Sequence, residues 1–480
     1  MNFSVILYLL GNVLLLEGVL MLLPCVTALI YREPQGVIYL LVALLCALLG
    51  YFLRRGRSQK LIFYAKEGFV AVGLSWIVLS LAGAIPFVLT GEIPSYTDAL
   101  FETISGFTTT GASILRDVEA LSHVSLLWRS FTHWIGGMGV IVFLLALLPA
   151  SGGYNMNLMR AESPGPQVGK LVPKVSETAK ILYSIYMFIT VLEIVVLIVA
   201  GMPVFDALCI SFGSAGTGGF GVLNDSCASY APHLQWIITL FIILFGVNFN
   251  AYYYLLRSKN KKEAFQIEEV RVYFAVILLS VIFISFNIRS FFATYSEALR
   301  HSAFQVGSII TTTGFATTDF NLWPNFSKTI LVLLMFVGAC AGSTGGGIKV
   351  SRIIIFNRTV QAEVRRFIHN RSVEMVRMDG KSLDQDTVRS VSVYLVAYVL
   401  IFVASVFLLS LTGTDLVTDF TAVAATLNNI GPGLNAVGPT GNYADMSLIA
   451  KYVLMFDMLA GRLELFPMLL LVVPATYRKN

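Results

Sequence analysis

Long apolar runs separated by short polar connections recur along the whole chain. Five of these runs stand out, and they cover residues 6–30, 37–53, 69–89, 181–200 and 391–411. A helix needs about 20 predominantly apolar residues to cross the hydrocarbon core of a bilayer. The pattern therefore predicts an all-α membrane protein with several transmembrane helices.

Four shorter amphipathic segments lie between the apolar runs, and a glycine-containing turn follows each one. They cover residues 95–108, 204–215, 296–311 and 416–428. Each is too short to span a membrane, so we interpret it as a re-entrant half-helix. The order of span, half-helix, turn and second span occurs four times, which indicates internal repetition of one structural unit.

This repetition divides the chain into five parts. An extra N-terminal transmembrane helix pair (1–60) precedes pore repeat 1 (61–160), pore repeat 2 (161–262), pore repeat 3 with an intramembrane gate loop (263–370) and pore repeat 4 (371–480). Irregular backbone at membrane depth is tolerated only where it is buried in protein or lines a water-filled cavity. We therefore expect the four turns to surround one pseudo-fourfold pore.

The four turns have the composition of a cation selectivity filter. Read in parallel, each has glycine as its third residue: Thr109-Thr110-Gly111-Ala112, Gly216-Thr217-Gly218-Gly219, Thr312-Thr313-Gly314-Phe315 and Asn429-Ile430-Gly431-Pro432. None contains Asp or Glu, so an ion would meet backbone carbonyls and hydroxyls, which replace the hydration shell of a monovalent cation. The half-helices would add partial negative charge at their C-terminal ends.

Acidic residues accompany the turns on the side that we expect to face outward. They are Asp117, Glu119, Asp225, Asp319 and Asp445. Such residues either raise the local concentration of cations or are ordinary solvated loop charges. The sequence leaves both interpretations open.

Residues 337–349 place five glycines inside the second span of the third repeat. Each glycine costs about 1 kcal/mol relative to alanine in a helix interior, so this helix should break. Gly338 and Gly342 also fit close packing of the small-xxx-small type, but such packing does not require the glycine run at 345–347. We therefore favour an intramembrane gate loop, whose expected residues are Gly342, Ser343, Thr344, Gly345, Gly346, Gly347 and Lys349.

Arg462 lies near the middle of the last expected span, residues 447–473. An arginine at the bilayer centre costs about 2.5–3.5 kcal/mol on insertion scales, so its side chain should face protein or water. We expect it to face the pore below the filter as a barrier to cations, with Lys349 adding to the same barrier. The structural alternative is an ion pair with Asp457 or Glu464.

The charge distribution argues for a membrane surface and against nucleic acid. The chain has 480 residues, of which 56% are hydrophobic and 13% charged, with a net charge of +5. Lys and Arg concentrate in the connections 54–66, 160–180, 257–271, 349–389 and at 478–479, which the positive-inside rule assigns to the cytoplasm. The five cysteines are isolated, so neither a zinc site nor a disulfide framework is indicated.

The histidines give no indication of an enzyme. His123, His133, His233, His301 and His369 are scattered, and the chain contains no H-E-x-x-H sequence. Without a constellation of catalytic groups, a membrane enzyme is the least favoured function.

The glycine-containing motifs resemble those of the Trk/Ktr/HKT superfamily of K⁺ transporters. The resemblance rests on TTTGAS at 108–113, GTGGFG at 216–221, TTTGFAT at 311–317, GSTGGGIKVSR at 342–352 and NNIGPGLN at 428–435. It covers essentially the whole chain. The two additional N-terminal spans are similar to those of the branch of TrkH membrane subunits.

The resemblance implies channel-like K⁺ uptake by a homodimer in the bacterial plasma (inner) membrane. It implies a cytosolic ring of nucleotide-binding regulatory subunits of the TrkA type, with ATP/ADP or NAD(H) on that partner and no cofactor beyond K⁺ on this chain. It also implies a gate below the filter. The implied K⁺ sites are Thr110, Gly111, Thr217, Gly218, Thr313, Gly314, Ile430 and Gly431.

Two details of the filter bear on its selectivity. Na⁺-selective plant relatives in this superfamily have Ser at the first filter glycine, whereas this chain has Gly111. The second turn has Gly216 where Ser or Thr is common, which removes one hydroxyl. The resemblance therefore implies K⁺ permeation with an altered second loop.

A K⁺ symporter coupled to H⁺ or Na⁺ is the main alternative. Such a protein needs a proton relay or an ion-coordinating carboxylate near the membrane midplane. The four turns supply none. Whether the flux is passive or coupled stays open.

Overall fold

The computed structural model describes residues 3–55, 65–139, 175–257, 261, 264, 266–369 and 374–477. Within these ranges the fold is all-α apart from a small antiparallel hairpin of β1 (Arg377–Met378) and β2 (Lys381–Ser382). The expected basic connections 54–66 and 160–180 lie mostly outside the described ranges, and the second span of the first repeat is described only as far as residue 139. All four boundaries expected between the five parts also lie outside them, so they stay predictions.

The predicted transmembrane helices are confirmed. Among the described residues, six helical stretches are long and apolar enough to cross a membrane. They correspond to α1 (Phe3–Leu20) with α2 (Leu22–Tyr31), α3 (Gln35–Arg55), α4 (Ala65–Leu89), α9 (Val175–Val199), α14 (Glu268–Asn287) and α18 (Gln385–Ser410). The protein is therefore a multi-pass membrane protein.

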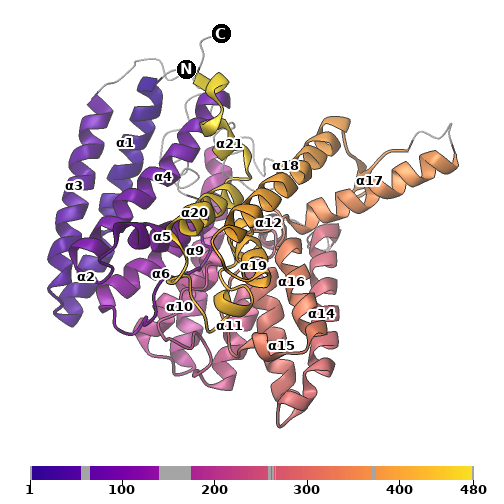
Figure 1. Ribbon diagram of the computed structural model, residues 1–480, viewed down its shortest axis with the longest axis horizontal. Helices are drawn as coiled ribbons and strands as arrows, with labels where there is room; N and C mark the ends of the chain where they lie inside the picture. Colours follow the sequence, from indigo (N-terminus) through magenta and orange to yellow (C-terminus); the bar gives the residue numbers. More distant parts are fainter. Residues whose placement is uncertain are drawn as a thin grey trace.

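Helices α1 and α3 form the extra N-terminal pair, which stands beside α4 at one edge of the molecule (Figure 1). Their glycines let the two backbones approach closely. A Cβ added to Gly11 would lie 2.8 Å from the carbonyl oxygen of Gly50, and one added to Gly50 would lie 2.7 Å from that of Gly11. Small residues at such contacts are typical of helix packing in membranes.

The four predicted half-helices are confirmed as α5 (Tyr96–Phe107), α10 (Val204–Gly216), α15 (Tyr295–Ile310) and α19 (Leu416–Leu427). Three begin at polar N-caps, because the side chains of Ser95, Thr294 and Asp415 accept backbone N–H groups of the first turn. Hydrogen bonds from Thr418 also lower the pKa of Asp415. The second half-helix instead follows Pro203.

The second spans of repeats two to four are broken. Helices α11 (Pro232–Phe245) and α12 (Phe249–Arg257) are bent by 91° at their junction. Helix α16 (Asn325–Val337) stops before α17 (Val350–Ile368), and α20 (Leu448–Arg462) stops before α21 (Phe466–Val472). In the first repeat, α6 (His123–Met138) occupies the corresponding position as far as the structure describes it. Four 3-10 turns complete the fold: η1 (Arg289–Phe291), η2 (Phe320–Leu322), η3 (Asn435–Val437) and η4 (Pro474–Tyr477).

The continuous last span expected at 447–473 is therefore wrong. The helix ends at Arg462, and Glu464 and Leu465 have positive φ values of 59° and 67°. Pro467 explains the break, because its ring would clash with the carbonyl of Leu463 in a continuous helix. Arg462 thus lies at the C-terminal end of α20, at the break, and not in the middle of a continuous helix.

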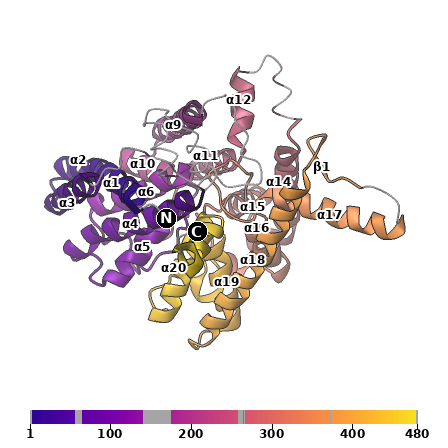
Figure 2. The ribbon, with the colours of Figure 1, turned by 90° about the horizontal axis from the view of Figure 1, so that it is seen from above.

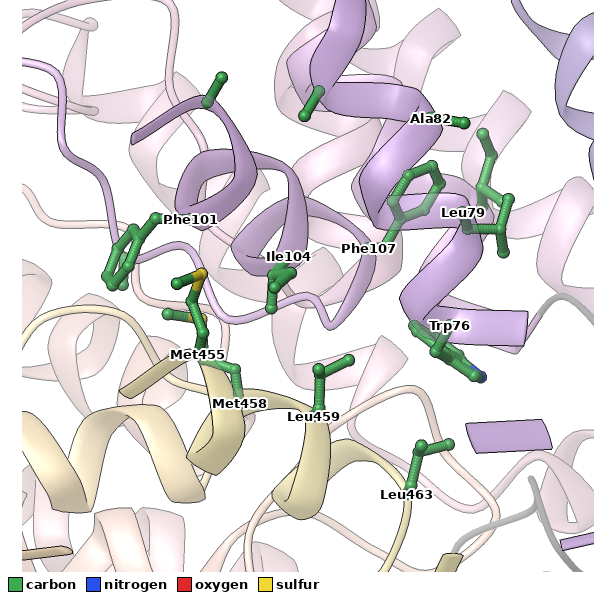
Figure 3. Packing of buried hydrophobic residues seen from close by; sticks show 14 of the residues in the cluster. Trp76, Leu79, Ala82, Phe101, Ile104, Phe107, Met455, Met458, Leu459 and Leu463 are labelled. Carbon is green, nitrogen blue, oxygen red and sulfur yellow. The ribbon is translucent and has the colours of Figure 1, made fainter. Parts of the chain in front are cut away.

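The first half-helix is buried between elements from opposite ends of the chain. Figure 3 shows Phe101 and Ile104 of α5 facing Met455 and Met458 of α20, while Phe107 lies beside α4. Helix α17 differs from all of these, because it extends away from the body of the molecule (Figure 1, Figure 2).

Candidate functional site

The four turns after the half-helices share one backbone conformation. A residue just past each helix has positive φ, which side chains rarely adopt: Thr109 (55°), Thr217 (54°), Thr312 (60°) and Asn429 (57°). Two residues later stands a glycine with positive φ: Gly111 (80°), Gly219 (78°), Gly314 (87°) and Gly431 (95°). The residue between donates its N–H to a carbonyl of the half-helix at 2.8–2.9 Å in every case. The four loops are therefore structural copies of one another.

This common geometry corrects the second loop by one residue. The sequence register placed Gly216, Thr217 and Gly218 at the first, second and third positions, but Gly216 is the last residue of α10. Thr217 occupies the first position, Gly218 the second and Gly219 the third. The loop therefore keeps the hydroxyl at its first position and lacks one at its second. Gly218 and Gly219 are adjacent, so only the backbone torsions distinguish them.

The third-position glycines interlock the loops. Each lies against the second-position carbonyl oxygen of the next loop, so an added Cβ would come too close to it. The pairs are Gly111 with Gly218, Gly219 with Thr313, Gly314 with Ile430 and Gly431 with Thr110. The last pair returns from the fourth loop to the first, where Asn429 Nδ2 also donates to Thr110 Oγ1 at 3.0 Å. The four loops thus form a closed ring, which we call the filter ring.

A polar cavity opens on one side of the filter ring. All four third-position glycines line it, together with residues that follow them, such as Ser113 and Asn224. Around it, Asp117 accepts from Asn224 Nδ2 at 2.8 Å, and Asp445 pairs with Arg116. These two carboxylates connect loops of different repeats, which favours a structural role for them over free surface charge.

The predicted break in the third repeat is confirmed by the irregular segment 338–349 between α16 and α17, which we call the gate loop. The N–H of Gly346 donates to Thr312 Oγ1 at 2.6 Å, and that of Gly347 donates to the Asn428 carbonyl at 3.1 Å. Both acceptors precede the filter glycines, whereas the polar cavity is lined by residues that follow them. The gate loop and the cavity therefore lie at opposite ends of the filter ring.

Glu269, in the first turn of α14, holds the gate loop from the side. Its side chain is buried, and Oε1 accepts from the N–H of Ala341 at 2.7 Å and of Ser351 at 3.0 Å. The bend between α11 and α12 adds a backbone contact, because Phe249 donates its N–H to the Gly342 carbonyl at 2.9 Å. The gate loop is thus anchored at separate points by two other helices.

Arg462 connects the gate loop to the end of α6. Its Nη1 donates to the Thr344 carbonyl at 2.9 Å, and its Nη2 donates to the carbonyls of Gly136 and of Gly137, the latter at 2.7 Å. Planar guanidinium groups suit such multiple acceptors. The side chain therefore bridges repeats one, three and four on the gate side of the filter ring.

The carboxylates expected to pair with Arg462 under the structural alternative have other partners. Glu464 forms an ion pair with Arg352. Asp457 accepts a hydrogen bond from Ser405 Oγ at 2.8 Å. Hydrogen bonds from Arg462 itself run to carbonyls of the gate loop and of α6.

Lys349 also binds within the gate region. It is buried at the start of α17 with a φ of 84°, and its Nζ donates to the Gly345 carbonyl. Both cations expected at the barrier, Lys349 and Arg462, therefore bind carbonyls of the gate loop.

Sequence reasoning placed Gly219 fourth in its turn and so outside the filter positions. It missed Glu269 and a buried ion pair between Glu102 and Arg129, whose Oε1 and Nε lie 2.6 Å apart. The last pair had a signal, because ionisable residues in membrane segments are rare and mark special positions. Glu269 had no such signal in the sequence, since acidic residues are common in the first turn of a helix.

The described residues contain no group of three or more His, Cys, Asp or Glu able to hold a metal ion.

Comparison with known proteins gives one consistent family. A sequence model of the TrkH family, described as a cation transport protein, matches residues 37–477. The chain is 37% identical over 488 residues to the Trk system potassium uptake protein TrkH of Salmonella typhimurium, with 100% of both chains covered. It is 32% identical to the Trk system potassium uptake protein TrkG of Escherichia coli, with 97% of each covered. The crystal structure of the potassium transporter TrkH from Vibrio parahaemolyticus matches with a TM-score of 0.90 at 34% identity, covering 100% of both chains.

Proposed function

The chain belongs to the TrkH family of cation transport proteins, and we propose that it takes up K⁺ through a channel-like pore lined by the filter ring. The observation that carries this proposal is the closure of the ring. Four loops of the same backbone conformation meet around one axis, each glycine against the carbonyl of the next loop. Such an arrangement suits a small ion that is bound by backbone oxygens from all sides.

The chemistry of the ring supports a monovalent cation. In the corrected register, the K⁺ sites are Thr110–Gly111, Gly218–Gly219, Thr313–Gly314 and Ile430–Gly431. Neutral carbonyl and hydroxyl oxygens replace the hydration shell of K⁺ without the strong binding that carboxylates give to divalent ions. The C-terminal ends of the four half-helices point into the ring and favour cations over anions.

The gate loop and Arg462 regulate this pore in the proposed mechanism. The gate loop lies on the side of the filter ring away from the polar cavity, and Arg462 holds it to α6 through backbone carbonyls. A positive charge on the ion path repels K⁺ most strongly where water is excluded. Opening then requires that the gate loop and the guanidinium leave the path together.

A cytosolic nucleotide-binding subunit of the TrkA type is the proposed regulator. The projecting helix α17 carries Arg365 and Arg366, and Arg377 lies in the following hairpin, so basic residues gather on one protruding element. Arg371 belongs to the same basic connection, 349–389, and lies outside the described residues. Charge complementarity would guide an acidic partner to this basic surface. We also propose that the protein is a homodimer and that it lies in the bacterial inner membrane.

Reconstitution of the purified chain into proteoliposomes tests the function. We expect a reversal potential that follows the K⁺ gradient and not the Na⁺ gradient, because the ring binds dehydrated K⁺. The potential should be unchanged by a protonophore or by removal of Na⁺. A potential that depends on the H⁺ or Na⁺ gradient would establish a coupled symporter, and a lack of K⁺ preference would reject the proposed filter.

A further inference from the structure

The ion pair between Glu102 on α5 and Arg129 on α6 is buried, with side chains 0% and 3% exposed. Burial of two charges costs desolvation free energy that often equals or exceeds their attraction, so a buried ion pair is a poor device for stability alone. Neither residue belongs to the filter loops. What the two side chains bind besides each other therefore indicates their role.

Glu102 holds the first filter loop. Its Oε2 accepts the N–H of Ile114 at 2.9 Å, and its Oε1 accepts a hydrogen bond from Ser113 Oγ at 2.9 Å. Both donors follow Gly111 closely in the chain. The carboxylate therefore fixes the segment by which the first loop leaves the filter ring.

Arg129 holds the second filter loop in the same way. Its Nη1 donates to the Gly221 carbonyl at 3.0 Å, and its guanidinium lies 3.6 Å from the centre of the Phe220 ring. His133, one turn further along α6, stacks on the same ring at 4.1 Å. Phe220 and Gly221 directly follow the filter glycine Gly219. One ion pair thus connects the exits of two neighbouring loops.

Two other junctions of the ring are built differently. The second and third loops are joined by neutral hydrogen bonds, such as that from the Cys227 N–H to the Ala316 carbonyl at 2.9 Å. The fourth and first are joined by the Tyr443 N–H and the Ser113 carbonyl at 2.8 Å, and by the exposed Arg116–Asp445 pair. Among the described residues, a buried ion pair connects filter-loop exits at the first junction alone.

We propose that Glu102 and Arg129 are positioning residues of the filter, whose ion pair fixes the distance between the first two loops and thereby sets the preference for K⁺ over Na⁺. This inference rests on the proposed function. Ionic charge-assisted bonds are shorter and stronger than neutral ones, so they resist relaxation of the loops toward a smaller ion. Loss of the pair should allow the carbonyls of both loops to approach Na⁺.

The test replaces both members by apolar residues, Glu102→Leu with Arg129→Met. Removal of both charges leaves no unpaired ion in the interior, so the fold should survive. The matched control is Asp98→Leu with Lys451→Met, which removes an ion pair of 2.6 Å at the other end of the same half-helix. A second variant, Arg129→Lys, keeps the charge but loses the planar fork that reaches both Glu102 and the Gly221 carbonyl.

The readout is the K⁺/Na⁺ permeability ratio from reversal potentials, with melting temperature as a measure of folding. We expect the ratio to fall about tenfold in the apolar double variant, the scale of one lost charge-assisted hydrogen bond, and to fall less in Arg129→Lys. The control should keep the wild-type ratio.

A folded double variant with the wild-type ratio would overturn the inference. If the double variant does not fold, Arg129→Lys decides: a lowered ratio at an unchanged melting temperature supports the inference, and an unchanged ratio rejects it. Failure of both variants to fold would reassign the pair to stability and also reject it. A wild type without K⁺ preference would instead refute the proposed function, before any variant is compared.

Discussion

The filter ring and the gate loop are both glycine-rich irregular backbone within the membrane, but they are held in different ways. In the filter ring, each glycine meets a backbone carbonyl of the next loop, and the pattern repeats until it returns to the first loop. The gate loop occurs once. Charged side chains from other helices, Glu269 and Arg462, bind it at separate points.

The contacts of the filter ring link all four loops, whereas those of the gate loop are confined to one segment. Displacement of one filter loop disturbs both of its neighbours, because backbone contacts in the ring leave no space. The gate loop also packs against backbone, because a Cβ added to Gly346 would lie 2.4 Å from the Asn428 carbonyl oxygen, but charged side chains bind it as well. The same kind of residue therefore builds a ring that closes on itself and a single loop that charged side chains hold.

The largest expected effect comes from Arg462→Ala. Two unit charges 4 Å apart at an effective dielectric of about 20 repel by about 4 kcal/mol, so its removal should raise passive Rb⁺ uptake on the order of a thousandfold without the regulatory subunit. Deletion of residues 345–347 should act in the same direction. Uptake per folded protein in proteoliposomes measures the effect.

Arg462→Lys is the matched control, because it keeps the charge and loses the fork that reaches three carbonyls. Uptake in this variant should stay close to wild type if charge is the barrier. Uptake that falls with the melting temperature in Arg462→Ala would mean that the arginine stabilises the fold instead.

Gly219→Ala should lower the K⁺/Na⁺ permeability ratio by about tenfold or more, because the new Cβ would push the Thr313 carbonyl out of the ring. Gly201→Ala is the control, since Gly201 also has positive φ but nothing within 4 Å of an added Cβ. Both changes carry a left-handed strain of about 1–2 kcal/mol. Reversal potentials separate them, and equal ratios in the two variants would show that Gly219 is not in the filter.

Glu269→Ala should increase K⁺ leak about tenfold, a smaller effect. The change leaves the buried N–H groups of Ala341 and Ser351 without their acceptor, which costs about 1–3 kcal/mol and destabilises the closed loop. Glu268→Ala is the control, because Glu268 is the neighbouring acidic residue of α14 and pairs with Arg358 instead. K⁺ flux per folded protein measures the leak. If both variants leak equally, Glu269 does not hold the gate loop closed.

The smallest effect is expected for Arg116→Ala. The Arg116–Asp445 pair joins the first and fourth loops, but its side chains are 71% and 82% exposed. Exposed ion pairs contribute about 0–1 kcal/mol and are screened by salt. The K⁺/Na⁺ permeability ratio should change by less than about twofold. A large change would mean that the geometry of the filter ring depends on the exposed Arg116–Asp445 pair as much as on its glycines.

The spans and half-helices were predictable because their signals are local. Runs such as 391–411 and 416–428 show their length and amphipathicity without any knowledge of their neighbours. The glycine break before α17 was predictable for the same reason. Pro467 was also a local signal for the end of α20. The prediction of a continuous span gave more weight to the apolar character of the whole segment.

The contacts that give the site its geometry could not be predicted from the sequence. Two adjacent glycines look alike in a sequence, so the position of Gly219 depended on torsion angles. Glu269 is 72 residues from Ala341 along the chain, and Arg129 is 92 from Gly221. No periodic pattern connects positions so far apart, because the packing of whole helices brings them together.

The closure of the filter ring also has a consequence for biosynthesis. The bond between Asn429 and Thr110 joins residues 319 positions apart, so the ring needs the last repeat for completion. Ribosomes add about 5–20 residues per second, which separates the two loops by on the order of half a minute. A nascent chain with three repeats in the bilayer therefore lacks a closed filter ring. Translation that stops before the fourth repeat yields a product in which the first and third loops have no fourth loop to contact.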